Sequence, residues 1–266
     1  MGPSSPFLCK DGFGTIEKID ASITQEGILK LADPSWQKKR GARLLADDLA
    51  SDINRAMAPK ALYHWFRIAS VKKEAIALAH PATGETARLS TGDFSPFFKK
   101  ANHLLIALYT LGNGLDALIN KFSHPHQEME RHFIYMGALS ALSKASSPLA
   151  TIAETRAKKE GVGVSPPLSP GSIDGWDLSG QREIAALFPL LQLGVSLNHL
   201  GLFTPMNTLS VVFAIGKGFS DRRAGSPCRL CRMGGLCSLT CSNHHLRSEP
   251  TGRLTGQRFR LFPHAK

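Results

Sequence analysis

The sequence has no long run of apolar residues. Polar residues interrupt the hydrophobic 42% of the chain throughout, and no stretch approaches the roughly 20 apolar residues that a membrane-spanning helix requires. The first 14 residues also lack a basic segment followed by an apolar one, which is the pattern of a secretory signal. We therefore expect no membrane contact and a cytoplasmic location.

Common catalytic motifs are absent as well. The chain contains no G-x-S-x-G, no H-E-x-x-H and no Walker loop. These absences argue against the hydrolases and nucleotide-binding enzymes that use these motifs. They leave open whether the protein is an enzyme.

Cysteine is scarce outside one short segment. Cys9 stands alone and is expected to be a simple thiol, whereas Cys228, Cys231, Cys237 and Cys241 follow the spacing C-x2-C-x5-C-x3-C. In a chain without an export signal, such clustering favours a metal over disulfides. Four thiolates can hold a [4Fe-4S] cluster or a tetrahedral zinc ion, and sulfur ligands alone do not distinguish the two.

Charge is concentrated in the same region. Residues 217–266 hold ten Lys and Arg against two acidic residues, so they carry +8 of the formal net charge of +11. A basic tail favours an anionic partner. Single-stranded nucleic acid is not expected, because no aromatic residue on which a base could stack occurs between Arg222 and Arg247.

Hydrophobic periodicity predicts both helices and strands. Helices are expected over 35–57, 115–122 and 127–159 and from Ser179 to Leu191, and strands over 62–71, 75–79, 104–110 and 209–215. The Pro-, Gly- and Ser-rich stretch 162–176 is expected to be an irregular loop. This irregular order predicts an α+β domain over 28–220, with a twisted, mainly antiparallel sheet flanked by helices. A partly disordered leader over 1–27 and a basic Cys-rich metal-binding tail over 221–266 complete the predicted organisation.

Three motifs within residues 28–219 give the chain a resemblance to a known family. They are Thr110-Leu111-Gly112-Asn113-Gly114-Leu115; Ser169-Pro170-Gly171-Ser172 with Gly175-Trp176 and Gln181; and Gly194-Val195-Ser196-Leu197 with Pro205 and Leu209-Ser210. In order and spacing they resemble the activation domain of cobalamin-dependent methionine synthase and its small stand-alone relatives.

The resemblance implies a role in corrinoid chemistry. In the family this domain binds S-adenosylmethionine beside cobalamin, so that inactive cob(II)alamin is reduced and remethylated. Carried over residue by residue, the resemblance implies a ligand loop formed by Ser169, Pro170, Gly171 and Ser172. It also implies a corrinoid protein or a cobalamin-dependent methyltransferase as partner, with cobalamin held by this chain or by that partner. Complete methyltransferase activity is not expected from this chain alone.

Two departures from the family pattern affect these expectations. Pro167 stands where the family has an arginine that pairs with the S-adenosylmethionine carboxylate, which argues against binding of that ligand. His199 replaces an acidic residue and is a candidate to face the corrinoid.

Two functions follow from these motifs. The first is an accessory protein for reductive activation of a corrinoid-dependent methyltransferase, with an iron–sulfur cluster as electron carrier because this activation needs low-potential electrons. The alternative is a non-catalytic binding module with a structural zinc site, whose basic tail contacts an acidic protein or nucleic acid.

Overall fold

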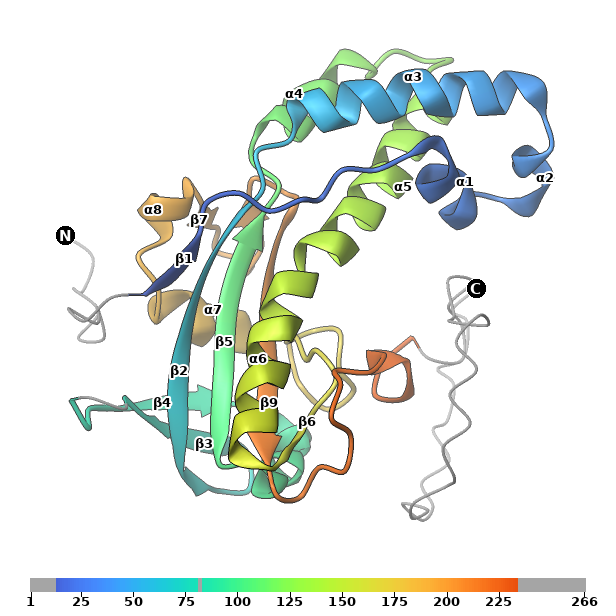
Figure 1. Cartoon of the computed structure of the whole chain (residues 1–266). Coiled ribbons are helices and arrows are strands. Elements are labelled where there is room, and N and C mark those ends of the chain that lie inside the picture. The colour runs from blue at the N-terminus through green and yellow to red at the C-terminus, as the bar shows by residue number, and fades with distance from the viewer. Residues whose placement is uncertain (1–12, 81–82, 234–266) are drawn as a thin grey trace, which may run out of the picture.

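A twisted antiparallel sheet forms the centre of the protein. The computed structural model describes residues 13–80 and 83–233 (Figure 1). Within them, a seven-stranded sheet has the order β4-β3-β2-β5-β9-β6, and β1 pairs with β2. Every pairing is antiparallel, and β7 and β8 form a separate hairpin. The strands are β1 Gly14–Ile16, β2 Lys60–Val71, β3 Ala75–Ala79, β4 Thr86–Ser90, β5 His103–Thr110, β6 Gly163–Val164, β7 Ser196–Leu197, β8 Phe203–Thr204 and β9 Thr208–Gly216.

Helices cover both faces of this sheet. In Figure 1, α5 runs from an upper helical region down to the sheet and α6 continues along one face, while α7 and α8 lie on the other side. The α-helices are α1 Gln25–Leu31, α2 Pro34–Gln37, α3 Arg40–Ala56, α4 Gly114–Lys121, α5 Glu128–Ala145, α6 Ser147–Glu160, α7 Gly180–Ala186 and α8 Leu190–Leu193; the 3-10 helices are η1 Gly92–Lys100 and η2 Pro227–Arg229. The predicted α+β class with a mainly antiparallel sheet is confirmed.

Two hydrophobic cores result from the alternation of side chains along the strands. On β2, Ala61 packs into the core shared with α1, α3, α5 and α6, whereas the next residue, Leu62, packs into the core beneath α7 and α8. The same alternation continues on β5 with Leu105 and Leu104. Since a central strand buries both faces, it has a continuous apolar run, and this explains why 104–110 was recognisable as an inner strand.

One predicted helix is divided in two. The sequence predicted helix over 127–159, and the structure has α5 and α6 with a break at Ser146. Pro148 lies in the first turn of α6, where its missing N–H is not needed, but the same residue cannot continue α5.

The helix predicted from Ser179 to Leu191 ends early. Ile184, Leu187 and Phe188 are buried as expected, but α7 stops at Ala186 and Leu191 is 92% exposed. Pro189 explains the difference, because the residue before a proline is disfavoured in the helical region. Leu191 therefore does not belong to the buried apolar face that the sequence predicted.

The expected leader is ordered in its second half. Residues 1–12 lie outside the described residues, but Gly14–Ile16 pairs with β2. Ile19, Ala21 and Ile23 are buried in the core beneath the helices. The partly disordered leader therefore stays a prediction for residues 1–12, whereas between Ile19 and Ile23 buried apolar side chains alternate with polar ones.

Within the described part of the chain, no helix combines the length and the apolar composition needed to cross a membrane.

Candidate functional site

The Ser169–Ser172 loop is a tight turn with its backbone largely satisfied. The Ser172 N–H donates to the Ser169 carbonyl at 3.2 Å, and the Gly171 N–H donates to the Trp176 carbonyl at 2.9 Å. Gly171 has φ +78°, and a Cβ at this position would lie 3.1 Å from the Leu178 side chain. Glycine is therefore required by both conformation and space. Pro170 is buried, whereas Ser172 is exposed.

Trp176 fixes this loop to the sheet. Its side chain is fully buried, and its indole Nε1 donates to the Ser90 carbonyl at the end of β4 at 3.0 Å. The indole also makes an edge contact with Phe98, with ring centroids 5.7 Å apart. A buried indole with a satisfied N–H combines a large apolar contact with a directional one. The loop therefore has a rigid base.

A chain of side-chain hydrogen bonds joins the second and third motifs. The Ser169 hydroxyl donates to the Ser210 carbonyl, the Ser210 hydroxyl donates to the Gln181 amide oxygen at 2.9 Å, and the Gln181 amide nitrogen donates to the Gly201 carbonyl at 3.1 Å. These contacts link the loop, α7, β9 and the β7–β8 hairpin. Because the Gln181 side chain and the Ser210 hydroxyl are buried, each depends on the other as a partner.

The first motif meets the third at the paired ends of β5 and β9. The Thr208 hydroxyl donates to the Thr110 hydroxyl at 2.8 Å, and the Leu111 N–H donates to the Asn207 carbonyl at 2.9 Å. A Cβ on Gly114 would lie 2.1 Å from the Ala56 carbonyl oxygen, so only glycine permits this contact with α3. The three motifs are thus distant in sequence and contiguous in the fold.

His199 is placed apart from the buried part of this network. It lies in the exposed turn between β7 and β8 and forms no hydrogen bond with any residue that the structure describes. The neighbouring Asn198 carboxamide accepts from the Leu200 and Leu202 N–H groups, which fixes the turn. The backbone at His199 is therefore fixed by the turn, and its imidazole faces solvent.

The cysteine segment contacts the loop directly. Cys231 forms an isolated antiparallel bridge with Ile173, the Asp174 N–H donates to the Leu230 carbonyl at 2.9 Å, and the Arg232 N–H donates to the Ser172 carbonyl at 3.0 Å. Two predicted sites, the ligand loop and the first half of the cysteine motif, are therefore neighbours. Nothing in the sequence signalled this pairing, because Ile173 and Cys231 are 58 positions apart.

Cys228 and Cys231 are the two predicted metal ligands within the described residues. Cys228 lies in η2, which the Ser226 hydroxyl caps by accepting the Cys228 N–H at 3.3 Å. The Met233 N–H donates to the Cys231 Sγ at 3.4 Å, a contact that resembles the N–H···S bonds around thiolate centres. Cys237 and Cys241 lie outside the described residues, within which no cluster of three or more metal-binding side chains occurs.

Pro167 lies in the partly buried approach to the loop. Its ring offers no hydrogen-bond donor. On the loop itself, the Ser172 carbonyl and the Asp174 N–H are already engaged by the cysteine segment. The carboxylate contact expected in the family therefore has no counterpart at this position.

Comparison with solved structures supports the fold. The chain is similar to a structure described as the MetH reactivation domain bound to AdoHcy, with 16% sequence identity and a TM-score of 0.50. The match covers 76% of this chain and 78% of that chain. No family model matches the sequence. No curated protein matches it either. The likeness establishes the activation-domain fold that the three motifs predicted.

Proposed function

We propose that this protein is an accessory protein for the reductive activation of a corrinoid-dependent methyltransferase. The observation that carries the proposal is that β9 hydrogen-bonds to both other motifs in a fold similar to the MetH reactivation domain. Ser210 joins it to the second motif, and Thr208 joins it to the first. The proposal places the protein in the cytoplasm with a cobalamin-binding module as its partner.

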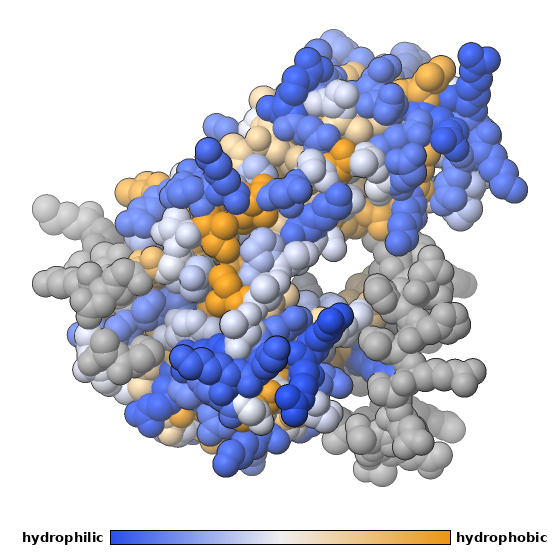
Figure 2. Space-filling view, viewed as in Figure 1, coloured by the Kyte–Doolittle hydropathy of each residue, from blue (hydrophilic) through white to orange (hydrophobic). Residues whose placement is uncertain are grey.

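An exposed apolar surface supports a protein partner. Leu200, Leu202, Met206 and Leu209 lie on the β7–β8 hairpin and at the start of β9 and are between 39% and 62% exposed. The face seen in Figure 2 also has exposed apolar side chains near its middle, below the helical region, where the sheet lies in Figure 1. Exposed apolar groups that cluster along the chain are typical of interaction surfaces. We assign the hairpin to contact with the cobalamin-carrying partner, with His199 at its tip facing the corrinoid.

A cluster held by Cys228, Cys231, Cys237 and Cys241 would supply low-potential electrons. Cys228 and Cys231 fit this role because they share a short capped segment with sulfurs that are partly exposed. When bound, such a cluster would supply one low-potential electron at a time for reduction of the corrinoid, and an external low-potential donor would re-reduce it. The protein's own contribution is to hold the cysteine segment against the loop through Ile173 and Ser172.

The metal assignment is tested by anaerobic purification of wild-type protein and of Cys228→Ser and Cys9→Ser variants. We expect about four iron atoms per chain and a brown colour in the wild type and in Cys9→Ser, and loss of both in Cys228→Ser. Cys9→Ser is the matched control, since it removes a thiol outside the motif. A colourless protein with zinc would contradict the iron–sulfur assignment.

The corrinoid assignment is tested separately by titrating cob(II)alamin, a cobalamin-loaded binding module of methionine synthase, and S-adenosylmethionine. Leu202→Asp is expected to weaken binding of the loaded module at least about tenfold, because a carboxylate must be desolvated at the interface. Leu44→Asp introduces the same change at an exposed position on α3 and serves as the control. We expect no S-adenosylmethionine binding, because Pro167 offers no donor. Absence of any interaction with the loaded module would reject the proposal.

The second candidate function is a non-catalytic binding module with a structural zinc site and a basic tail. The observation in its favour is that the cysteine segment forms backbone hydrogen bonds with the loop, as a structural element would. Zinc in the purified protein, together with no corrinoid interaction, would favour this function and its acidic-protein or nucleic-acid partner.

A further inference from the structure

A groove that none of the three motifs lines lies between α6 and β2. It is open to solvent, has a volume of about 660 Å³ and is lined by residues that include Trp65, Ile152, Thr155, Arg156 and Lys159. This volume falls within the roughly 300–1,000 Å³ typical of sites for small organic ligands. The groove combines an apolar wall with cationic side chains.

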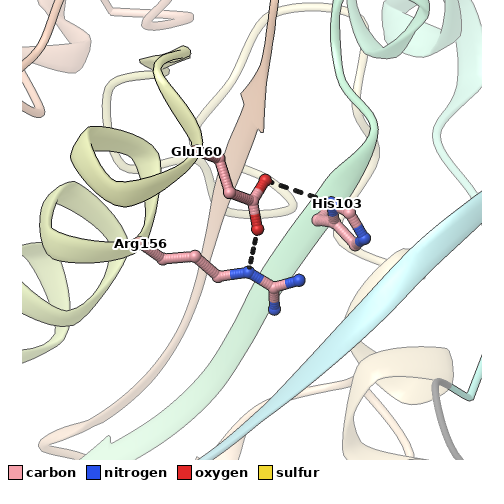
Figure 3. Close-up of polar contacts among 3 residues, drawn as sticks. All are labelled: His103, Arg156 and Glu160. Carbon is pink, nitrogen blue, oxygen red and sulfur yellow. Dashed lines mark hydrogen bonds and ion pairs between the residues drawn. The ribbon is translucent and has the colours of Figure 1, made fainter.

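Arg156, which lines this groove, is held in place by Glu160 (Figure 3). Its Nε donates to Glu160 Oε1 at 2.7 Å, and Glu160 Oε2 lies 3.7 Å from His103 Nδ1. The guanidinium carbon lies 4.2 Å from the centroid of the Trp65 ring. Two contacts therefore fix its plane, and the two terminal nitrogens make no hydrogen bond to any described residue. A fixed guanidinium with unused donors suits bidentate binding of an oxyanion.

The charges around the groove favour an anion. Lys159 lines it, and the Lys159 ammonium has no ion-pair partner among the described residues. Arg67 lies opposite His103 on the paired strands β2 and β5. Burial first, and Arg156 second, lower the pKa of His103, so this imidazole is neutral near pH 7. Two cations, Arg156 and Lys159, therefore line the groove with one carboxylate, Glu160.

We propose that this groove binds an organic phosphate of nucleotide size. The phosphate contacts the terminal nitrogens of Arg156 and the Lys159 ammonium. A flat ring lies along the apolar side chain of Ile152, beside the Trp65 ring that the Arg156 guanidinium covers. Glu160 keeps Arg156 oriented and accepts hydrogen bonds from ligand hydroxyls. The site is one of binding without turnover, and it is independent of the corrinoid role, since no residue of the Ser169–Ser172 loop lines it.

The test is calorimetric titration of the full chain with AMP and, in a separate series, with inorganic phosphate. AMP is expected to bind at least about tenfold more tightly than phosphate, because only AMP also contacts the apolar wall. Lys159→Gln is expected to weaken AMP binding about fivefold to twentyfold. Lys159 is exposed, so this variant should retain the fold, which a circular dichroism spectrum and a thermal melt verify.

Lys158→Gln is the matched control. It removes the same charge from the adjacent exposed position of α6, which does not line the groove. AMP binding within about twofold of wild type in this variant supports the site. An equal loss in both variants, AMP binding no tighter than phosphate, or no detectable binding of AMP at millimolar concentration would each overturn the proposal.

Discussion

The Gln181 carboxamide lies between Ser210 and Gly201, accepting from the Ser210 hydroxyl at 2.9 Å and donating to the Gly201 carbonyl at 3.1 Å. Gln181 is 8% exposed, so water does not readily replace either partner. One side chain from the second motif thus connects β9 to the hairpin that carries His199.

Replacing Gln181 with methionine is expected to lower the free energy of unfolding by about 2–3 kcal/mol, because two buried polar groups lose their partner. The change keeps the length of the side chain and removes its hydrogen bonds. Urea denaturation measures the effect. Gln192→Met, at an exposed position in α8, should change stability by less than about 0.5 kcal/mol, and equal effects in the two variants would refute the role of the network.

Gly171→Ala is expected to cost more stability than Gly161→Ala. Both glycines have positive φ, +78° and +68°, so both substitutions carry the strain of about 1 kcal/mol for a left-handed alanine. Only at Gly171 does a Cβ also approach Leu178, at 3.1 Å, whereas no atom lies within 4 Å at Gly161. Thermal melts of the two variants measure the difference. A larger loss for Gly161→Ala would contradict the geometry of the loop.

Stability is expected to fall as the pH drops from about 6.5 towards 4, with His64 as one cause. Burial first, and the nearby His80 second, together lower the pKa of His64 to about 4; the two rings are stacked at a centroid distance of 4.7 Å. The folded pKa lies below the ordinary value near 6.5, so the unfolded chain binds the extra proton in this window and stability rises with pH through it. Solvent screens this half-buried ring, and we expect a contribution of about 1–2 kcal/mol.

The His64 contribution is isolated by comparing variants. Urea denaturation at pH 7 and at pH 4.5 should show a smaller loss of stability on acidification in His64→Gln than in wild type. His199→Gln, which removes an exposed imidazole, should follow the wild-type pH dependence. An unchanged pH dependence in His64→Gln would exclude this residue as the source.

The amide of Asp174 should be protected from hydrogen exchange by the docked cysteine segment. Its N–H donates to the Leu230 carbonyl, and the Leu230 side chain packs against the core beneath α7 and α8. Leu230→Ser should weaken this docking and raise the exchange rate at Asp174 by about tenfold, since about 1–2 kcal/mol of apolar burial is lost. Leu191→Ser, at a 92% exposed position, should leave the rate unchanged. Exchange at Asp174 that is fast already in the wild type would show that the segment does not dock.

The sequence predicted those parts of the fold whose causes are local. The strand at Ala75–Ala79 was predicted with its observed bounds, and the strand over 104–110 differs from β5 only by His103, because strong apolar runs end at turn residues there. The break at Ser146 was missed since the apolar periodicity continues across it, although Pro148 was a visible signal. β4 was missed because its exposed positions, such as Thr86 and Arg88, dilute the alternation.

The motifs of the candidate site could be predicted from the sequence, but the contacts between them could not. The motif containing Ser169 and the one containing Ser210 were recognised, but their hydrogen bond depends on the pairing of Leu168 with Val212, which are distant in sequence. The Arg156–Glu160 pair had a sequence signal in its i, i+4 spacing. The stacking of Arg156 on Trp65 had none, because it depends on where α6 crosses the sheet.

The bridge between Ile173 and Cys231 couples the two predicted sites, the ligand loop and the cysteine segment. Docking of the cysteine segment and the shape of the loop are linked states, since Ser172 and Asp174 share their backbone hydrogen bonds with it. Thermodynamic linkage is reciprocal. If metal binding at the cysteines raises the affinity of the loop for a ligand that favours the docked state, that ligand raises the affinity of the cysteines for the metal by the same factor. Ligand affinity measured with and without metal would therefore report the strength of this bridge in either direction.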